Sequence, residues 1–116
     1  MRITGISFVG TRTAAHPAMR ELLRDVLGLS LAEPTAGMDA DVFDLPDGSS
    51  FAVAPVTPSD EQERTVGFSV EDLDRAHRAL QDAGVSVDAE ITTNDRYRYV
   101  HFRAPDGHLY ELVEER

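Results

Sequence analysis

The feature that most constrains the fold of this sequence is an internal repeat. The segment Phe8–Thr13 aligns with Thr65–Val70, and both contain a Val-Gly pair. Further along, Phe43–Gly48 aligns with Phe102–Gly107, and these segments share a Phe and a Pro-Asp-Gly triplet. The two alignments have nearly the same offset in the sequence, which indicates a duplicated supersecondary unit. Such a duplication constrains the architecture more strongly than any single motif does. We therefore expect two copies of one structural module.

The chain length and one polar stretch define how these modules are organised. With 116 residues the chain is long enough for one compact domain and too short for two domains that fold independently. The stretch 55–64 is polar and contains two prolines, which predicts a linker at about residues 57–64 between modules at about 1–56 and 65–116. Each module has a strand, a helix and then strands joined by tight turns. This order predicts an α+β fold of two βαβββ modules.

Two amphipathic segments predict one helix per module. The first covers residues 17–27 and ends at Gly28, and the second begins at Asp72, whose carboxylate can cap it, and ends at Gly84. Apolar residues three and four apart form one buried face on each helix: Met19, Leu22, Leu23, Val26 and Leu27 on the first, and Leu73, Ala76, Ala79, Leu80 and Ala83 on the second. Both faces need a sheet to cover, which leaves the other sheet face free to line a cleft.

The two Pro-Asp-Gly triplets predict hairpin turns. Proline fixes φ at the first corner, and glycine accepts the positive φ at the exit of the turn. A single triplet is common, but two copies that each follow a Phe and precede an alternating strand support the duplication.

The assembled pattern resembles the vicinal oxygen chelate superfamily, which has the glyoxalase, bleomycin resistance and extradiol dioxygenase fold. The resemblance covers nearly the whole chain and includes Asp25–Leu29, Val70–Leu73 and Phe102–Leu112. It implies that the two modules form a curved mixed sheet around a cleft, with the helices on the outer face. It also implies a homodimer. The fold hosts many activities, so the resemblance alone does not define the function.

The usual metal ligands of this superfamily are mostly replaced. Metal-dependent members place a His on the first strand of a module and a carboxylate on the last. By resemblance, the first-strand positions here are Phe8 and Thr65, and the last-strand positions are Ala52 and Glu111. A phenyl ring and a methyl group cannot ligate a metal, and a neutral hydroxyl is a poor ligand. One carboxylate does not hold a catalytic metal without partners, so we expect neither a metal nor another cofactor.

Period-two alternation predicts which strand residues point into the cleft. If Val100 and Phe102 face the helices, their neighbours face the cleft. The predicted ligand-binding residues are Phe8, Thr65, Tyr97, Tyr99, His101, Arg103 and Glu111, and Arg12 joins them if the first strand continues. Glu111 and His101 are the candidates for acid–base catalysis. Alternatively, Glu111 pairs with Arg103 or another basic residue, His101 is a half-buried hydrogen-bonding residue, and the tyrosines only pack.

The remaining histidines and one loop carry no assigned role. His16, His77 and His108 have no partner at metal-binding spacing and are expected at the surface. Met38 lies in an Ala-Gly-containing stretch that is interpreted as an ordinary loop, with a mobile rim over the cavity as the alternative.

Charge and composition exclude several classes of partner and chemistry. The formal net charge of −10 repels phosphate backbones and anionic membranes, so neither nucleic acid nor a membrane is an expected partner. The absence of cysteine excludes disulfides and thiolate chemistry. No apolar run has the length of a membrane-spanning helix, and Met1 leads directly into a strand-like stretch, which favours the cytoplasm.

These observations favour a metal-free protein that binds a small organic molecule, cationic or aromatic, in a dimer cleft. The alternative is an enzyme of the lyase, isomerase or dioxygenase type that uses substitute metal ligands or a Glu/His acid–base pair. A structural or partner-binding module is a third hypothesis, and a cleft filled by side chains would distinguish it.

Overall fold

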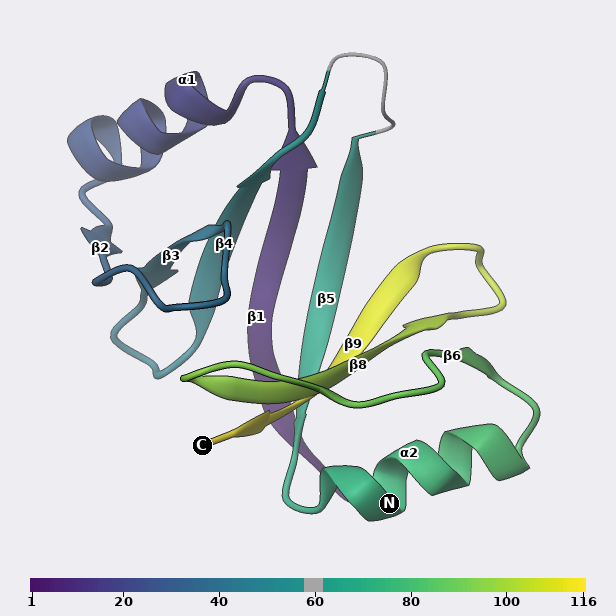
Figure 1. Cartoon of the computed structure of the whole chain (residues 1–116). Coiled ribbons are helices and arrows are strands. Elements are labelled where there is room, and N and C mark those ends of the chain that lie inside the picture. The colour runs from purple at the N-terminus through teal and green to yellow at the C-terminus, as the bar shows by residue number, and fades with distance from the viewer. Residues whose placement is uncertain (58–61) are drawn as a thin grey trace.

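The two modules form one curved mixed sheet with both helices on its outer face, which confirms the expected α+β fold (Figure 1). The computed structural model describes residues 1–57 and 62–116. The first module contains β1 (Ile3–Thr13), α1 (His16–Glu21), the π-helical turn η1 (Leu22–Val26), β2 (Ser30–Leu31), β3 (Asp41–Asp44) and β4 (Ser50–Pro55). The second contains β5 (Glu63–Val70), α2 (Leu73–Asp82), β6 (Ser86–Val87), β7 (Thr92–Thr93), β8 (Tyr97–Arg103) and β9 (Leu109–Glu115).

The strand order in the sheet is β2-β3-β4-β1-β5-β9-β8-β6, and the short strand β7 also pairs with β8. The modules meet along β1 and β5, which run antiparallel. On this seam Val9 lies opposite Val66 and Phe8 lies opposite Gly67. The two Val-Gly pairs of the repeat therefore face each other at the centre of the molecule.

The last strand of each module pairs in parallel with the first strand of the same module. In the first module Gly10 on β1 lies opposite Ala52 on β4. In the second, Gly67 on β5 lies opposite Glu111 on β9. The equivalence of Ala52 and Glu111 that the repeat implies is thus present in the register of the sheet.

Helix α2 packs on the second half of the sheet as expected, except that Ala83, predicted on its buried face, is exposed. Asp72 accepts a hydrogen bond from the backbone N–H of Arg75 and caps the helix. The core beneath the helix consists of Val70, Leu73, Ala76, Val100 and Leu112, with Phe68, Leu80, Val87, Ile91 and Phe102 packed against it. Val100 and Phe102 therefore face the helix.

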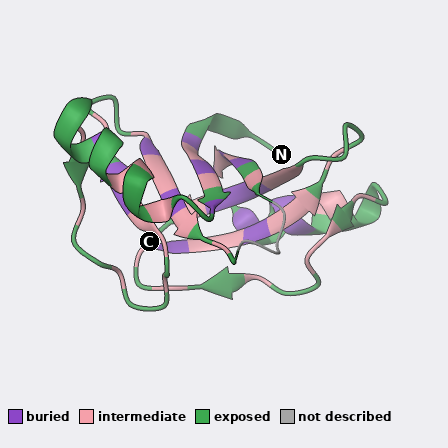
Figure 2. Ribbon diagram, turned by 90° about the horizontal axis from the view of Figure 1, so that it is seen from above, coloured by how far each residue is buried: buried purple, intermediate pink, exposed green. Residues whose placement is uncertain are grey.

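The apolar face expected on the first helix is largely wrong. Leu23 is buried against Phe43 and Val53, but Leu22, Val26 and Leu27 are 43%, 75% and 59% exposed. The reason is that η1 has π-helical hydrogen bonds, such as Leu27 N–H to the Leu22 carbonyl at 2.9 Å. The wider turn rotates these side chains away from the sheet. Figure 2 shows that the outer turns of α1 and η1 are exposed.

Both Pro-Asp-Gly triplets form the predicted turns. Gly48 and Gly107 have φ of 88° and 82°, and their N–H groups donate to the Leu45 and Ala104 carbonyls at 3.1 and 2.9 Å. They connect β3 to β4 and β8 to β9, so the predicted hairpins are confirmed.

Strand β5 begins at Glu63, two residues before the predicted start of the second module at residue 65. Residues 58–61 of the predicted linker lie outside the described part of the chain. None of the described helices has the length and apolar character needed to cross a membrane.

Candidate functional site

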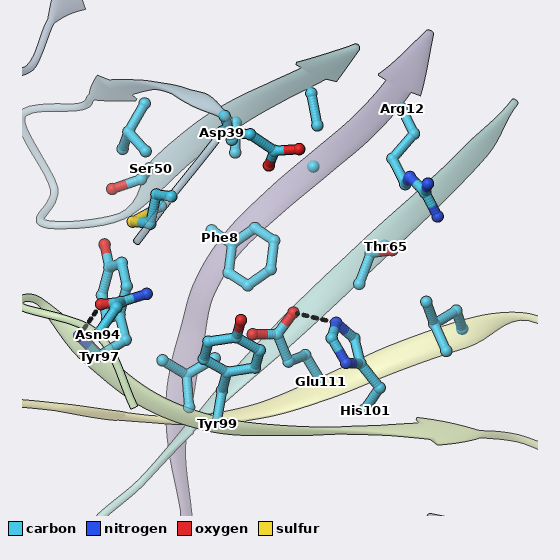
Figure 3. Close-up of a pocket in the computed structure, with 18 of the residues that line it drawn as sticks. Phe8, Arg12, Asp39, Ser50, Thr65, Asn94, Tyr97, Tyr99, His101 and Glu111 are labelled. Carbon is cyan, nitrogen blue, oxygen red and sulfur yellow. Dashed lines mark hydrogen bonds and ion pairs between the residues drawn. The ribbon is translucent and has the colours of Figure 1, made fainter. Parts of the chain in front are cut away.

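The concave face of the sheet carries a cavity of about 530 Å³. Its wall comes from both modules of a single chain, from β1, β4, β5, β8 and β9 together with the loop before β3 (Figure 3). The side chains drawn in the close-up include Phe8, Arg12, Asp39, Ser50, Thr65, Asn94, Tyr97, Tyr99, His101 and Glu111. The volume lies within the range of about 300–1,000 Å³ that is typical of small-molecule sites.

The structure brings six of the seven predicted ligand-binding residues into this wall. They are Phe8, Thr65, Tyr97, Tyr99, His101 and Glu111, and Arg12 lines the cavity as well. Alternation along β8 places every second side chain on this face because one face is occupied by the helix core. Contact of these side chains with a ligand remains a prediction.

Arg103 does not belong to the cavity wall. Its guanidinium group donates to Glu63 Oε1 at 2.6 Å and to the Gly107 carbonyl oxygen at 3.1 Å. These contacts hold the side chain beyond the end of the cavity, so the expectation that Arg103 points into the cleft is wrong. Glu111 does not contact Arg103 but pairs with His101, so the alternative that it pairs with a basic residue is met by the histidine.

The ring of Phe8 lies directly over the glycines at the seam between the modules. A Cβ atom on Gly67 would come within 2.3 Å of the Phe8 ring, and one on Gly10 within 3.0 Å. Only a residue without a side chain leaves room for the ring at Gly67. The floor of the cavity is therefore an aromatic face (Figure 3).

His101 lies between two carboxylates. Its Nε2 is 3.3 Å from Glu111 Oε2, and its Nδ1 is 3.0 Å from Asp88 Oδ2. The contact with Glu111 raises the pKa of His101 above its ordinary value, with a further contribution from Asp88, while burial opposes the shift. The Glu111 side chain is only 11% exposed, so its charge is largely removed from water.

The two tyrosines of β8 add aromatic surface with polar ends. Burial raises the pKa of both Tyr97 and Tyr99, so each phenol stays protonated at neutral pH. Arg96 lies 5.1 Å from the centre of the Tyr97 ring, and the Tyr99 ring meets His101 edge-on at 5.4 Å. Both phenols can donate a hydrogen bond to a bound molecule.

Several lining residues were not predicted because they lie on loops. Asp39 reaches the cavity from the loop before β3, and Asn94 and Asp88 reach it from the segments before β8. Met38, from the same loop as Asp39, lines the cavity too, which agrees with the alternative interpretation of that loop as a rim. No periodic pattern specifies where a loop side chain points. Ser50 follows the alternation of β4 with Ala52 and could have been found from it.

His77 was expected at the surface, but it is only 9% exposed. Its Nε2 lies 2.7 Å from the Asp88 carbonyl oxygen and donates to it. This contact ties helix α2 to the segment that carries the Asp88 carboxylate. His16 is half-buried beside Asp41, whereas His108 is exposed as expected.

Comparison with known proteins identifies the family. A profile of the Glyoxalase/Bleomycin resistance protein/Dioxygenase superfamily matches residues 5–112. The chain belongs to this superfamily. The curated proteins gave no match to it. The superfamily assignment confirms the resemblance based on the repeat and its turns.

Solved structures of this superfamily superpose on nearly the whole chain. Methylmalonyl-CoA epimerase from Mycobacterium tuberculosis is 24% identical, with a TM-score of 0.76 over 97% of this chain and 88% of that one. The Mn(II)-bound glyoxalase from Novosphingobium aromaticivorans is 20% identical, with a TM-score of 0.76 over 97% of this chain and 39% of that one. A variant of the Streptomyces coelicolor methylmalonyl-CoA epimerase, solved with 2-nitronate-propionyl-CoA, is 21% identical, with a TM-score of 0.70 over 97% and 98%. At these identities the likeness shows the fold alone.

The positions that hold a metal in metal-dependent members of the superfamily do not fit one in this chain. They are Phe8, Ala52, Thr65 and Glu111, and the Phe8 ring covers the glycines between them. In residues 1–57 and 62–116, no group of three or more His, Cys, Asp or Glu side chains is placed to hold a metal ion. A single carboxylate beside an aromatic ring lacks the donors that zinc, nickel, iron or manganese requires.

Proposed function

We propose that the cavity binds a small organic molecule with a cationic group on an aromatic or apolar body, and that it does so without a metal. The observation that carries this proposal is the composition of the wall, where three carboxylates meet three aromatic rings. The carboxylates are Asp39, Asp88 and Glu111, and the rings are Phe8, Tyr97 and Tyr99. A cation over an aromatic face and close to a carboxylate is stabilised by both groups.

The charge balance of the wall favours a cation over an anion. Its basic groups are Arg12 and His101, so the three carboxylates leave an excess of negative charge even when His101 is protonated. Asp39 makes no hydrogen bond or ion pair with any described residue, so its charge is available to a ligand. The net charge of −10 also raises the local concentration of cations around the protein.

Within one chain, strands β1, β4, β5, β8 and β9 supply most of the cavity wall. The homodimer and the cytoplasmic location that the sequence suggests remain predictions.

The enzyme alternative has two forms, one with substitute metal ligands and one with a metal-free acid–base pair, and the second has more support. Substitute metal ligands would need a third donor beside His101 and Glu111, and the nearest, Asp88, lies on the far side of the imidazole ring. An acid–base pair without metal needs only the contact between His101 and Glu111, which is present.

The proposal is tested with three probes of similar shape and different charge. We expect phenethylamine to bind more tightly than 2-phenylethanol, and 3-phenylpropionate to bind most weakly, because the wall has excess negative charge. Titrations followed by calorimetry and by amide shifts in two-dimensional NMR would give the affinities and the location. Equal affinity for the ammonium and the carboxylate, or no saturable shift at the cavity residues, would contradict the proposal.

The matched variants are Asp39→Asn and Asp82→Asn, which remove one negative charge inside and outside the cavity. Because Asp39 is exposed, we expect the first to weaken phenethylamine binding by about two- to fivefold. Asp82 lies on the exposed side of α2, away from the cavity, and its variant should bind like the original protein.

A further inference from the structure

We propose that Glu111, His101 and Asp88 form a proton relay, in which Glu111 is the base of the cavity, His101 carries the proton outward, and Asp88 is a positioning residue. The inference goes beyond ligand binding because it assigns a reaction class, removal of a proton from an uncharged carbon or oxygen acid. It shares with the proposed function only the requirement that a small molecule enters the cavity.

The three side chains form a continuous chain of polar contacts from the cavity towards solvent. Figure 3 shows its first contact, between Glu111 and His101. Glu111 Oε2 lies 3.3 Å from His101 Nε2, and His101 Nδ1 lies 3.0 Å from Asp88 Oδ2. Exposure rises along the chain, from 11% for the Glu111 side chain to 36% for His101 and 42% for Asp88. A proton taken up in the buried part of the site therefore has a direct route to water.

Asp88 is held in the orientation that this role requires. The same Oδ2 atom that accepts from His101 Nδ1 also accepts from the His101 backbone N–H at 2.9 Å. The Asp88 backbone N–H donates to the His101 carbonyl at 2.9 Å, and the Asp88 carbonyl accepts from His77 Nε2 at 2.7 Å. These contacts hold Nδ1 against Asp88 and Nε2 against Glu111. The proposed relay uses the neutral tautomer with its proton on Nδ1, because Nε2 must be free to accept a proton from Glu111.

The second oxygen of Glu111 is the atom that meets a bound molecule. None of the described residues donates a hydrogen bond to it, and Figure 3 shows the carboxylate directed into the cavity below the Phe8 ring. The charged and titratable side chains that face His101 are Glu111, Asp88 and Tyr99.

The proposed step is balanced as follows. A Glu111 oxygen forms an O–H bond with the proton of the bound acid, and the electron pair of the broken bond stays on the molecule. Glu111 then passes a proton to His101 Nε2, and the resulting imidazolium is stabilised by the carboxylates on both sides. His101 finally releases a proton to water. The working state has neutral His101, so the rate should rise with pH through the pKa of the histidine.

The positioning role of Asp88 is tested without any substrate. Nitrogen-15 NMR of the imidazole gives the pKa and the tautomer of His101 in the intact protein. We expect Asp88→Asn to lower the pKa of His101 and to reduce the population with the proton on Nδ1, and Asp82→Asn to change neither. An unchanged pKa and tautomer in Asp88→Asn would overturn the role of Asp88. Asp88→Glu, which keeps the charge, should restore part of the effect.

Base catalysis at Glu111 is tested with 5-nitrobenzisoxazole, an uncharged probe. A base that removes its C3 proton leaves the electron pair to form a nitrile while the N–O bond breaks, and a coloured phenolate is released. We expect the original protein to catalyse this elimination on the order of 10²-fold faster than Glu111→Gln does. We expect Asp88→Asn to move the pH profile to lower pH, and Asp82→Asn to leave it unchanged. Equal rates for the original protein and Glu111→Gln would overturn the relay.

Because 5-nitrobenzisoxazole carries no charge, the experiments can contradict the cation-binding proposal and the relay proposal independently of each other. Elimination without preference for phenethylamine would remove the cation-binding function and leave the relay intact. Saturable phenethylamine binding without Glu111-dependent elimination would remove the relay and leave the binding function intact.

Discussion

The close approach of the Phe8 ring to Gly67 predicts that Gly67→Ala destabilises the protein. The new Cβ would lie 2.3 Å from one ring carbon and 2.5 Å from another, whereas relaxed contacts between carbon atoms are about 3.5 Å or longer. The ring must therefore shift by about 1 Å into the cavity. Overpacking of this size lowers the free energy of unfolding by about 1–3 kcal/mol. The backbone itself accepts alanine, because Gly67 is not among the glycines with positive φ.

Gly5→Ala is the matched control, since it lies on β1 and its Cβ would meet nothing within 4 Å. Replacement of glycine by alanine inside a strand is then neutral or stabilising by roughly 0.5–1 kcal/mol. Urea denaturation of Gly67→Ala, Phe8→Ala and the double variant gives a thermodynamic cycle. We expect the double variant to recover about 1 kcal/mol or more of the sum of the single losses. Additive losses, or a Gly67→Ala protein as stable as Gly5→Ala, would refute the contact.

Two further predictions concern the first helix and the cavity histidine. Leu23→Ala should lower the free energy of unfolding, measured by urea denaturation, by about 2–5 kcal/mol because Leu23 is 5% exposed. Val26→Ala should change it by no more than about 0.5 kcal/mol because Val26 is 75% exposed. Similar losses in the two variants would mean that the π-helical turn is misplaced. The folded-state pKa of His101 is raised above its ordinary value of 6.5, so its contribution to stability is complete below pH 6.5 and is lost as pH rises through the raised value. The free energy of unfolding of the original protein should therefore fall as the pH rises across that window. This pH dependence should be absent in His101→Gln, and if it is unchanged in that variant, another group causes it.

The sequence predicts the central part of this fold because duplication and strict periodicity leave little freedom there. The Val-Gly pairs mark the two seam strands, Asp72 caps its helix, and alternation along β8 places Tyr97, Tyr99 and His101 on the cavity face. Each of these features depends on backbone geometry that is local or repeated. A sequence pattern can report such geometry directly.

The remaining features depend on tertiary contacts, which the periodicity of apolar residues in the sequence does not encode. An extra residue in the turn of η1 turns Val26 outward, although its spacing from Leu22 and Leu23 is typical of a buried helix face. Arg103 follows the alternation of β8, yet an ion pair with Glu63 fixes it outside the cavity. Asp88 enters the site from an irregular segment that is held by hydrogen bonds with His77 and with the backbone of His101.

The place of β9 in the sheet has a consequence for how the protein acquires its cavity. This strand is synthesised after both β5 and β8, yet it lies between them and carries Glu111. Until it docks, β5 and β8 present open backbone edges that can pair with other chains. We expect docking of the β8–β9 hairpin on β5 to be a slow step of folding, because these contacts join segments far apart in the sequence. We infer that conditions which delay this step favour aggregation, and that a molecule which fits the finished cavity can act as a folding aid.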